Sequence, residues 1–116
     1  MAYDEQLAAR VRKFLGDRTD VVERKMFGGL TFMVSGRMCC GVNRDELIVR
    51  LDPDREDEAL TRAHARPMDL TGRPMRGFVT IGPKSLTGAR LNRWLQEAVA
   101  GAELSGADVI PSKRRS

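Results

Sequence analysis

Apolar positions recur at helical spacing near both ends of this 116-residue chain. From Asp4 to Leu15 they lie three or four positions apart, with basic residues between them, and Gly16 follows directly. This spacing predicts an amphipathic helix, and a glycine commonly lies just past the end of a helix. The clearest periodicity predicts a last helix from Thr87 to about Glu103, with an apolar stripe at Leu91, Trp94, Leu95, Ala98, Val99 and Ala102.

Segments in which apolar and polar residues alternate predict strands between these two helices. Ser35-Gly36 suits a two-residue hairpin turn, and Thr71-Gly72-Arg73-Pro74 suits a turn between two later strands. Tight turns of this kind join antiparallel neighbours. The predicted strands are Val21 to Met26, Leu30 to Val34, Arg37 to Val42, Glu46 to Leu51, Pro67 to Leu70 and Gly77 to Ile81.

A further helix is predicted between the fourth and fifth strands. Asp52 is suited to the N-cap and Pro53 to the first helical position, and the helix is expected to run to about Ala65. The acidic residues of its first turn complement the positive end of a helix, which explains them without a metal site. The order α-β-β-β-β-α-β-β-α predicts an α+β fold of two layers, an antiparallel sheet with helices on one face.

The predicted hairpin has a consequence for the two faces of the sheet. If Val34 pairs with Arg37, one face carries Leu30, Phe32, Val34 and Cys39, and the opposite face carries Met33, Met38, Cys40 and Val42. Both faces are then largely apolar, but one layer of helices covers only one of them. The other face must meet solvent, a loop or another chain. We therefore expect self-association or a protein partner.

Composition is that of one ordinary domain, with 41% hydrophobic and 31% charged residues. We assign residues 1–104 to the domain and 105–116 to a basic tail. No apolar run approaches the roughly 20 residues that span a bilayer, and the acidic N-terminus does not resemble a signal peptide. A cytoplasmic protein without membrane contact is expected. Cys39 and Cys40 are adjacent, so they cannot form a disulfide framework, and buried packing is favoured over a redox role.

The net charge of +4 raises the alternative of nucleic-acid association. Half of it comes from residues 105–116, where Lys113, Arg114 and Arg115 outnumber Asp108. The remainder is diffuse, and a diffuse excess attracts phosphate weakly and in a salt-sensitive way. The candidate contacts are the tail residues Lys113, Arg114 and Arg115, together with Arg10, Arg37, Arg73 and Arg76.

Candidate catalytic chemistry is sparse. The segment from Gly77 to Ser85 approaches a phosphate-binding loop, but Pro83 interrupts it and lacks the N–H that would face phosphate. His64 is the single histidine, and no acidic orienter or nucleophile accompanies it in the sequence. One histidine and two adjacent cysteines do not supply a zinc site. We therefore expect no catalytic residue, no cofactor and no metal, and hence no enzyme.

Two glycine-framed segments are the most specific motifs. The first contains Met26-Phe27-Gly28-Gly29 and then Gly36-Arg37-Met38, and the second is Gly72-Arg73-Pro74-Met75, followed by Gly77. Together they resemble the N-terminal domain of the TfoX/Sxy competence-regulator family, whose members carry a Met-Phe-Gly-Gly run, a Gly-Lys/Arg-Met hairpin and a later Gly-Arg-Pro-Met. The resemblance covers nearly the whole chain and implies the same two-layer arrangement.

Our first hypothesis is a non-catalytic regulatory or protein-interaction module with this fold. The nucleic-acid alternative is an accessory factor linked to competence or transcription regulation. Competence regulators of this family carry a second, C-terminal helical domain, and because the chain ends at Ser116 we expect a standalone N-terminal domain. The motif glycines suit turns or bulges, and a small-ligand or enzyme pocket at the two glycine turns, with Arg73 or Arg76 holding an anion, is the third reading. The candidate interaction residues are Met26, Phe27, Gly28, Gly29, Gly36, Met38, Gly72, Arg73, Pro74, Met75 and Gly77.

Overall fold

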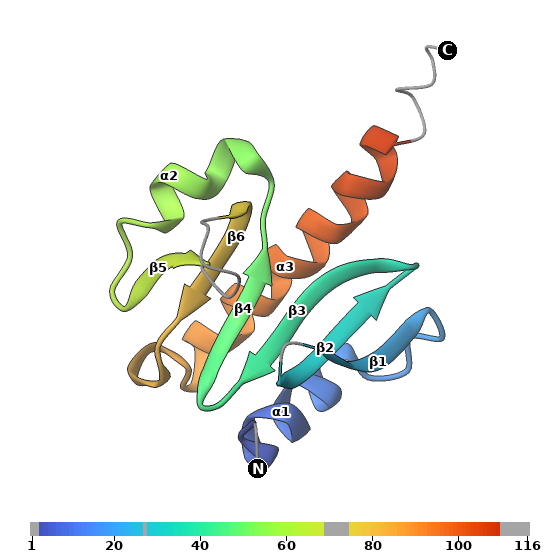
Figure 1. Cartoon of the computed structure of the whole chain (residues 1–116), viewed down its shortest axis with the longest axis horizontal. Coiled ribbons are helices and arrows are strands. Elements are labelled where there is room, and N and C mark those ends of the chain that lie inside the picture. Colours follow the sequence, from blue (N-terminus) through green and yellow to red (C-terminus); the bar gives the residue numbers. More distant parts are fainter. Residues whose placement is uncertain (1–2, 27, 69–74, 110–116) are drawn as a thin grey trace.

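Six strands form one antiparallel sheet in the order β1-β2-β3-β4-β6-β5 (Figure 1). The computed structural model describes residues 3–26, 28–68 and 75–109. The order of elements confirms the predicted α+β fold. The elements are α1 (Glu5–Leu15), β1 (Val21–Met26), β2 (Gly29–Val34), β3 (Arg37–Asn43), β4 (Glu46–Arg50), the short 3-10 helix η1 (Pro53–Arg55), α2 (Glu56–Ala59), β5 (Ala65–Met68), β6 (Met75–Ile81), the 3-10 helix η2 (Pro83–Ser85) and α3 (Gly88–Val109).

Helices α1 and α3 cover the same face of the sheet (Figure 1). The carboxylate of Asp4 caps α1 by accepting from two backbone N–H groups, and Gly16 ends the helix with a φ of 58°. Helix α3 packs across β3 and β4, where Gly101 permits close contact, because a Cβ there would lie 2.5 Å from the carbonyl oxygen of Arg50. Trp94 is buried in this core, as its place on the apolar stripe predicts.

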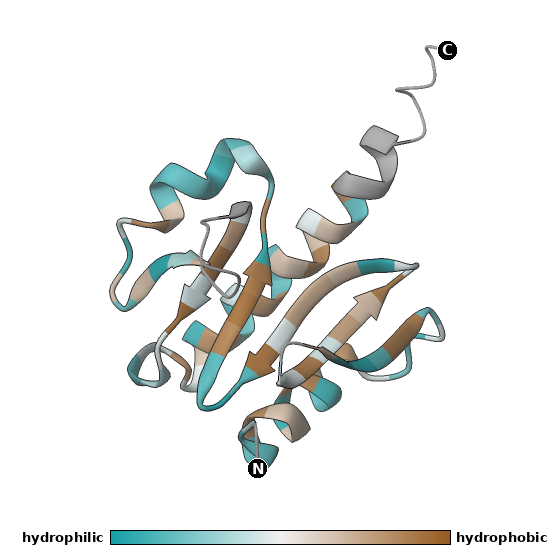
Figure 2. Ribbon diagram, in the orientation of Figure 1, coloured by the Kyte–Doolittle hydropathy of each residue, from teal (hydrophilic) through white to brown (hydrophobic). Residues whose placement is uncertain are grey.

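Apolar residues are concentrated in the central strands, whereas α2 is largely hydrophilic (Figure 2). Between the sheet and the two long helices, side chains from both layers pack into one core, and burial of this apolar surface is the main stabilising contribution to the fold. Its largest fully buried members include Val11, Phe32, Val34, Leu47, Val49, Val79, Ile81 and Leu95.

A β-bulge at Cys39 changes the two faces predicted for the hairpin. Val34 pairs with Arg37 as expected, but Met33 then pairs with Met38 and Phe32 with Cys40, so Cys39 is the extra residue. The shift turns Cys40 and Val42 toward the helices, where both are fully buried. Their predicted place on the opposite face was therefore wrong, because strict alternation fails beyond an inserted residue.

The second helix is much shorter than its pattern predicts. Asp52 does cap the segment, accepting from the N–H of Asp54, but Pro53–Arg55 is 3-10 and α2 is a single turn ending at Ala59. Beyond it the chain turns through His64, which has a φ of 64°, and β5 starts at Ala65 by pairing with Ile81. Pairing with β6 thus outweighs helical propensity. The predicted turn at 71–74 and the end of its first strand lie outside the described residues.

Candidate functional site

The sheet face opposite α1 and α3, here called the open face, carries much of the family-like motif. Cross-strand pairing aligns Val22, Met33 and Met38 across β1, β2 and β3. The neighbouring row joins Thr31, Gly41, Ile48 and Thr80, from β2 to β6. Because paired residues of an antiparallel sheet point to the same face, these rows form one continuous surface. Its apolar residues are Val22, Met26, Met33, Met38, Ile48, Met68 and Phe78.

The open face has a closed half and an exposed half. Over β4, β5 and β6, Ile48, Met68 and Phe78 form a small buried cluster with exposures of 3%, 1% and 8%. Over β1, β2 and β3, Val22 is 52% exposed, and Met33 and Met38 are half-buried. Val22, Met33 and Met38 are thus apolar residues of this half that remain partly open to solvent.

Charged side chains also lie on the closed half. The guanidinium of Arg66 donates to both carboxylate oxygens of Glu46, at 2.8 and 2.7 Å. These hydrogen bonds hold the pKa of Glu46 below its usual value. The guanidinium carbon of Arg50 lies 4.9 Å from the ring centroid of Phe78. Both contacts leave this half largely occupied by the chain's own groups.

Gly29 and Gly41 line a shallow depression where the exposed half meets the closed half. A Cβ at Gly29 would collide with the carbonyl oxygen of Val42, and one at Gly41 would lie 3.2 Å from that of Leu30. The strands approach closely because neither glycine carries a side chain. The depression, of about 10 Å³, is walled by Met26, Thr31, Met38 and Ile48. It holds no more than about one water molecule, so it is too small to enclose an organic ligand.

The other motif glycines have backbone roles. Gly28 and Gly36 lie in turns with φ values of 78° and 82°, in agreement with the turn interpretation of the first motif. Gly77, with a φ of 85°, donates its N–H to the buried carboxylate of Glu56 at 2.8 Å. From the sequence, Glu56 is expected only to be one of the acidic residues at the start of a helix. No local sequence signal predicts this hydrogen bond, because the two residues belong to separate elements.

Several predicted site residues are not placed. Phe27, Gly72, Arg73 and Pro74 lie outside the described residues, and Met75 is described only as the first residue of β6. The tail residues Lys113, Arg114 and Arg115 are also outside. Of the other basic candidates, Arg10 is exposed on α1 and Arg37 donates to the carbonyl oxygen of Ser35 in the hairpin, so the two lie on different layers.

The cysteines and the histidine occupy structural positions. Cys39 and Cys40 are free thiols and both are fully buried. The contact with Cys39 and complete burial raise the pKa of Cys40 well above its usual value, which keeps this thiol protonated. Nδ1 of the exposed His64 lies 2.9 Å from Oγ of Ser85, and that hydroxyl donates to the carbonyl oxygen of Ala63. Nδ1 is therefore the donor, and this geometry does not activate the serine.

Across residues 3–26, 28–68 and 75–109, no three His, Cys, Asp or Glu side chains are grouped to hold a metal ion. Among the helices in those same ranges, none has the length and apolar character needed to cross a bilayer.

The geometry defines the class of this protein as an α+β domain with a methionine-rich open face. The family model described as the TfoX N-terminal domain matches residues 13–102, more than three quarters of the chain. The chain belongs to this family. Searches of curated proteins and of solved structures return no match. Membership supports a regulatory context related to competence.

Proposed function

We propose that this protein is a non-catalytic regulatory domain of the cytoplasm that binds a protein chain, most simply a second copy of itself. The contact surface is the exposed half of the open face. The observation that supports this proposal is the row of Val22, Met33 and Met38, which keeps apolar side chains at the surface of an otherwise well-packed sheet. Exposed apolar rows flanked by polar residues are typical of interaction sites.

The residue types suit such a role. Methionine side chains are flexible and polarisable, so they adapt to a partner's shape. The edge strand β1 adds Arg24 and Lys25 as an exposed polar rim, and its outer backbone groups have no neighbouring strand in the sheet. A partner strand alongside β1 would extend both the backbone pairing and the apolar row.

Catalysis is not part of the proposal because the described reactive side chains are engaged or inaccessible. The two thiols are buried, and His64 donates toward a serine whose proton is already used. Family membership supports the regulatory character. The fold itself assigns no activity, so the contact surface carries the argument.

Sedimentation velocity of the full chain tests self-association. A charge in the apolar row is expected to dissociate the assembly, because burial of an unpaired carboxylate in an interface is unfavourable. Val22→Glu should therefore sediment as a monomer at concentrations where the wild type associates. Ala9→Glu, which adds the same charge to an exposed position of α1, should behave as the wild type. Circular dichroism checks that both variants remain folded.

A wild type that stays monomeric at high concentration would contradict self-association. Affinity capture from the native cell extract, with and without nuclease, then tests a different protein partner. A partner that survives nuclease and is lost with Val22→Glu supports the proposed surface. Binding that disappears on nuclease treatment or falls steeply with salt would instead indicate the nucleic-acid alternative.

A further inference from the structure

A cavity of about 230 Å³ lies on the helix layer, away from the open face. It sits between the start of α3 and the turn that follows α2. The turn contributes Arg62 and Ala63, and η2 contributes Ser85. Helix α3 contributes Arg90, Arg93 and Trp94. Three guanidinium groups from two separate elements thus line one small space, which we call the arginine cavity.

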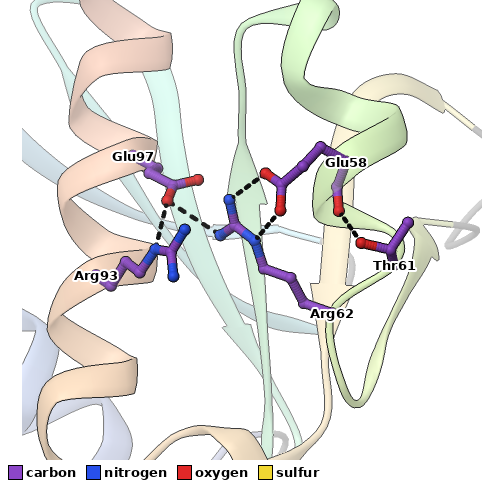
Figure 3. A network of polar contacts seen from close by, with 5 residues as sticks. All are labelled: Glu58, Thr61, Arg62, Arg93 and Glu97. Atoms are coloured by element: carbon purple, nitrogen blue, oxygen red, sulfur yellow. Dashed lines mark hydrogen bonds and ion pairs between the residues drawn. The ribbon is translucent and has the colours of Figure 1, made fainter.

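Arg62 is held firmly in the wall of this cavity. Its guanidinium donates to both carboxylate oxygens of Glu58, at 3.0 and 2.5 Å, and to Glu97 at 3.0 Å (Figure 3). The same group lies 4.6 Å from the ring centroid of Trp94, and its side chain is only 14% exposed. These contacts fix the position of the charge before any ligand arrives, which reduces the entropic cost of binding.

The other two arginines retain donors for a ligand. Arg93 donates to Glu97 through Nε at 3.2 Å, and its terminal nitrogens make none of the contacts drawn in Figure 3. Arg90 makes no ion pair with any residue in the part of the chain that the structure describes. The cluster consists of the three arginines and their two acidic neighbours, Glu58 and Glu97. Its net charge is therefore +1.

The uncharged walls define the shape of the cavity. Ser85 is buried, and its hydroxyl is already bonded to Ala63 and His64, so it shapes the wall rather than offering a proton. Trp94 is covered on one ring face by Arg62. Arg90 and Arg93 are therefore the residues that contact a ligand, because they lie at the more exposed end of the cluster.

We infer that the arginine cavity binds a phosphate group, either free phosphate or the phosphate of a small molecule. Arg90 and Arg93 hold its oxygens, and Arg62 is the fixed positive charge behind them. A guanidinium presents paired N–H donors that match the oxygens of an oxyanion, and several of them favour a doubly charged ligand. The cavity is smaller than the roughly 300–1,000 Å³ of typical ligand pockets, which restricts the ligand to a phosphate with few further atoms.

The test measures binding of inorganic phosphate to the full chain by calorimetry and by thermal unfolding, at constant ionic strength set with chloride. Phosphate should stabilise the wild type beyond the chloride control. Arg90→Gln and Arg93→Gln should each weaken the affinity about tenfold, as expected for loss of a charge-assisted hydrogen bond. The matched control is Arg44→Gln, at an exposed arginine outside the cavity, which should bind as the wild type does.

Glycerol phosphate distinguishes between the two possible ligands, free phosphate and a phosphorylated small molecule. Tighter binding than inorganic phosphate assigns the cavity to a phosphorylated small molecule, and equal binding assigns it to free phosphate. A wild type that responds no more to phosphate than to chloride would overturn the inference. Equal weakening in all three variants would also overturn it, since that pattern indicates diffuse charge. These outcomes are independent of Val22 and the open face.

Discussion

The two faces of the sheet differ in what covers them, although the same strands supply both. Phe32 points toward α1 and α3 and is fully buried, whereas Met33, the next residue of β2, is half-buried on the open face. Both side chains are large and apolar. Their positions relative to the helix layer, rather than their hydrophobicity, therefore decide which contributes to folding and which is available for contact.

The largest expected difference between the faces comes from truncating these two neighbours. Phe32→Ala should reduce the free energy of unfolding by about 3–5 kcal/mol, because it removes a large buried side chain and leaves a cavity. Met33→Ala should cost less than about 1 kcal/mol in the monomer, since its site is partly open to solvent. Urea unfolding monitored by circular dichroism measures both values. Equal losses would mean that the open face is packed as a core.

The paired glycines of the Met-Phe-Gly-Gly motif provide a second comparison. Gly29→Ala should cost about 3 kcal/mol, because the new methyl group meets the backbone of β3. Gly28→Ala should cost only about 1 kcal/mol, since its site is open and the penalty is the positive φ alone. Thermal and urea unfolding of the two variants measure the difference. A larger effect at Gly28 would contradict the assigned role of Gly29.

Ion pairs on the two layers should also differ in how much they contribute to the free energy of unfolding. Glu97 and Arg62 form an ion pair in which the side chains are 16% and 14% exposed, and Arg62 lines the arginine cavity. Glu97→Gln should reduce the free energy of unfolding by about 1–2 kcal/mol, between the values typical of exposed and buried pairs. The loss should change little between low and high salt because the pair is poorly screened. Urea unfolding at two salt concentrations measures this, and a loss abolished by salt would contradict the burial of the pair.

The smallest effect is expected for the pair of Glu46 and Arg66 on the open face. The pKa of Glu46 is lowered by Arg66, so its stabilisation is present above the unfolded-state pKa of about 4.3 and is lost as pH falls through the lower folded-state value. Glu46→Gln should cost less than about 1 kcal/mol at pH 7. The difference in the free energy of unfolding between wild type and variant should shrink in acid, as measured by urea unfolding at pH 7 and pH 3. If the difference in the free energy of unfolding is the same at both pH values, the effect comes from packing and not from the charge of Glu46.

Much of the fold was predictable because local patterns agree with the tertiary structure. Strand β1 has the predicted bounds, and the turn at Ser35-Gly36 pairs Val34 with Arg37 as expected. The motif also grouped three residues that the structure brings together, because Met26, Gly29 and Met38 line one depression of the open face. The contact of Gly77 with Glu56 was missed, because the two residues are 21 positions apart and meet only through packing.

Hydrophobic spacing, capping residues and turn glycines act on near neighbours, and they already specify the element order and the antiparallel hairpin. Three other features required the assembled structure: the bulge at Cys39, the early end of α2 and the arginine cavity. Each depends on contacts between distant segments, such as Arg62 with Glu97 and Trp94. Those contacts form only when the helix layer closes over the sheet, so no window of sequence contains them.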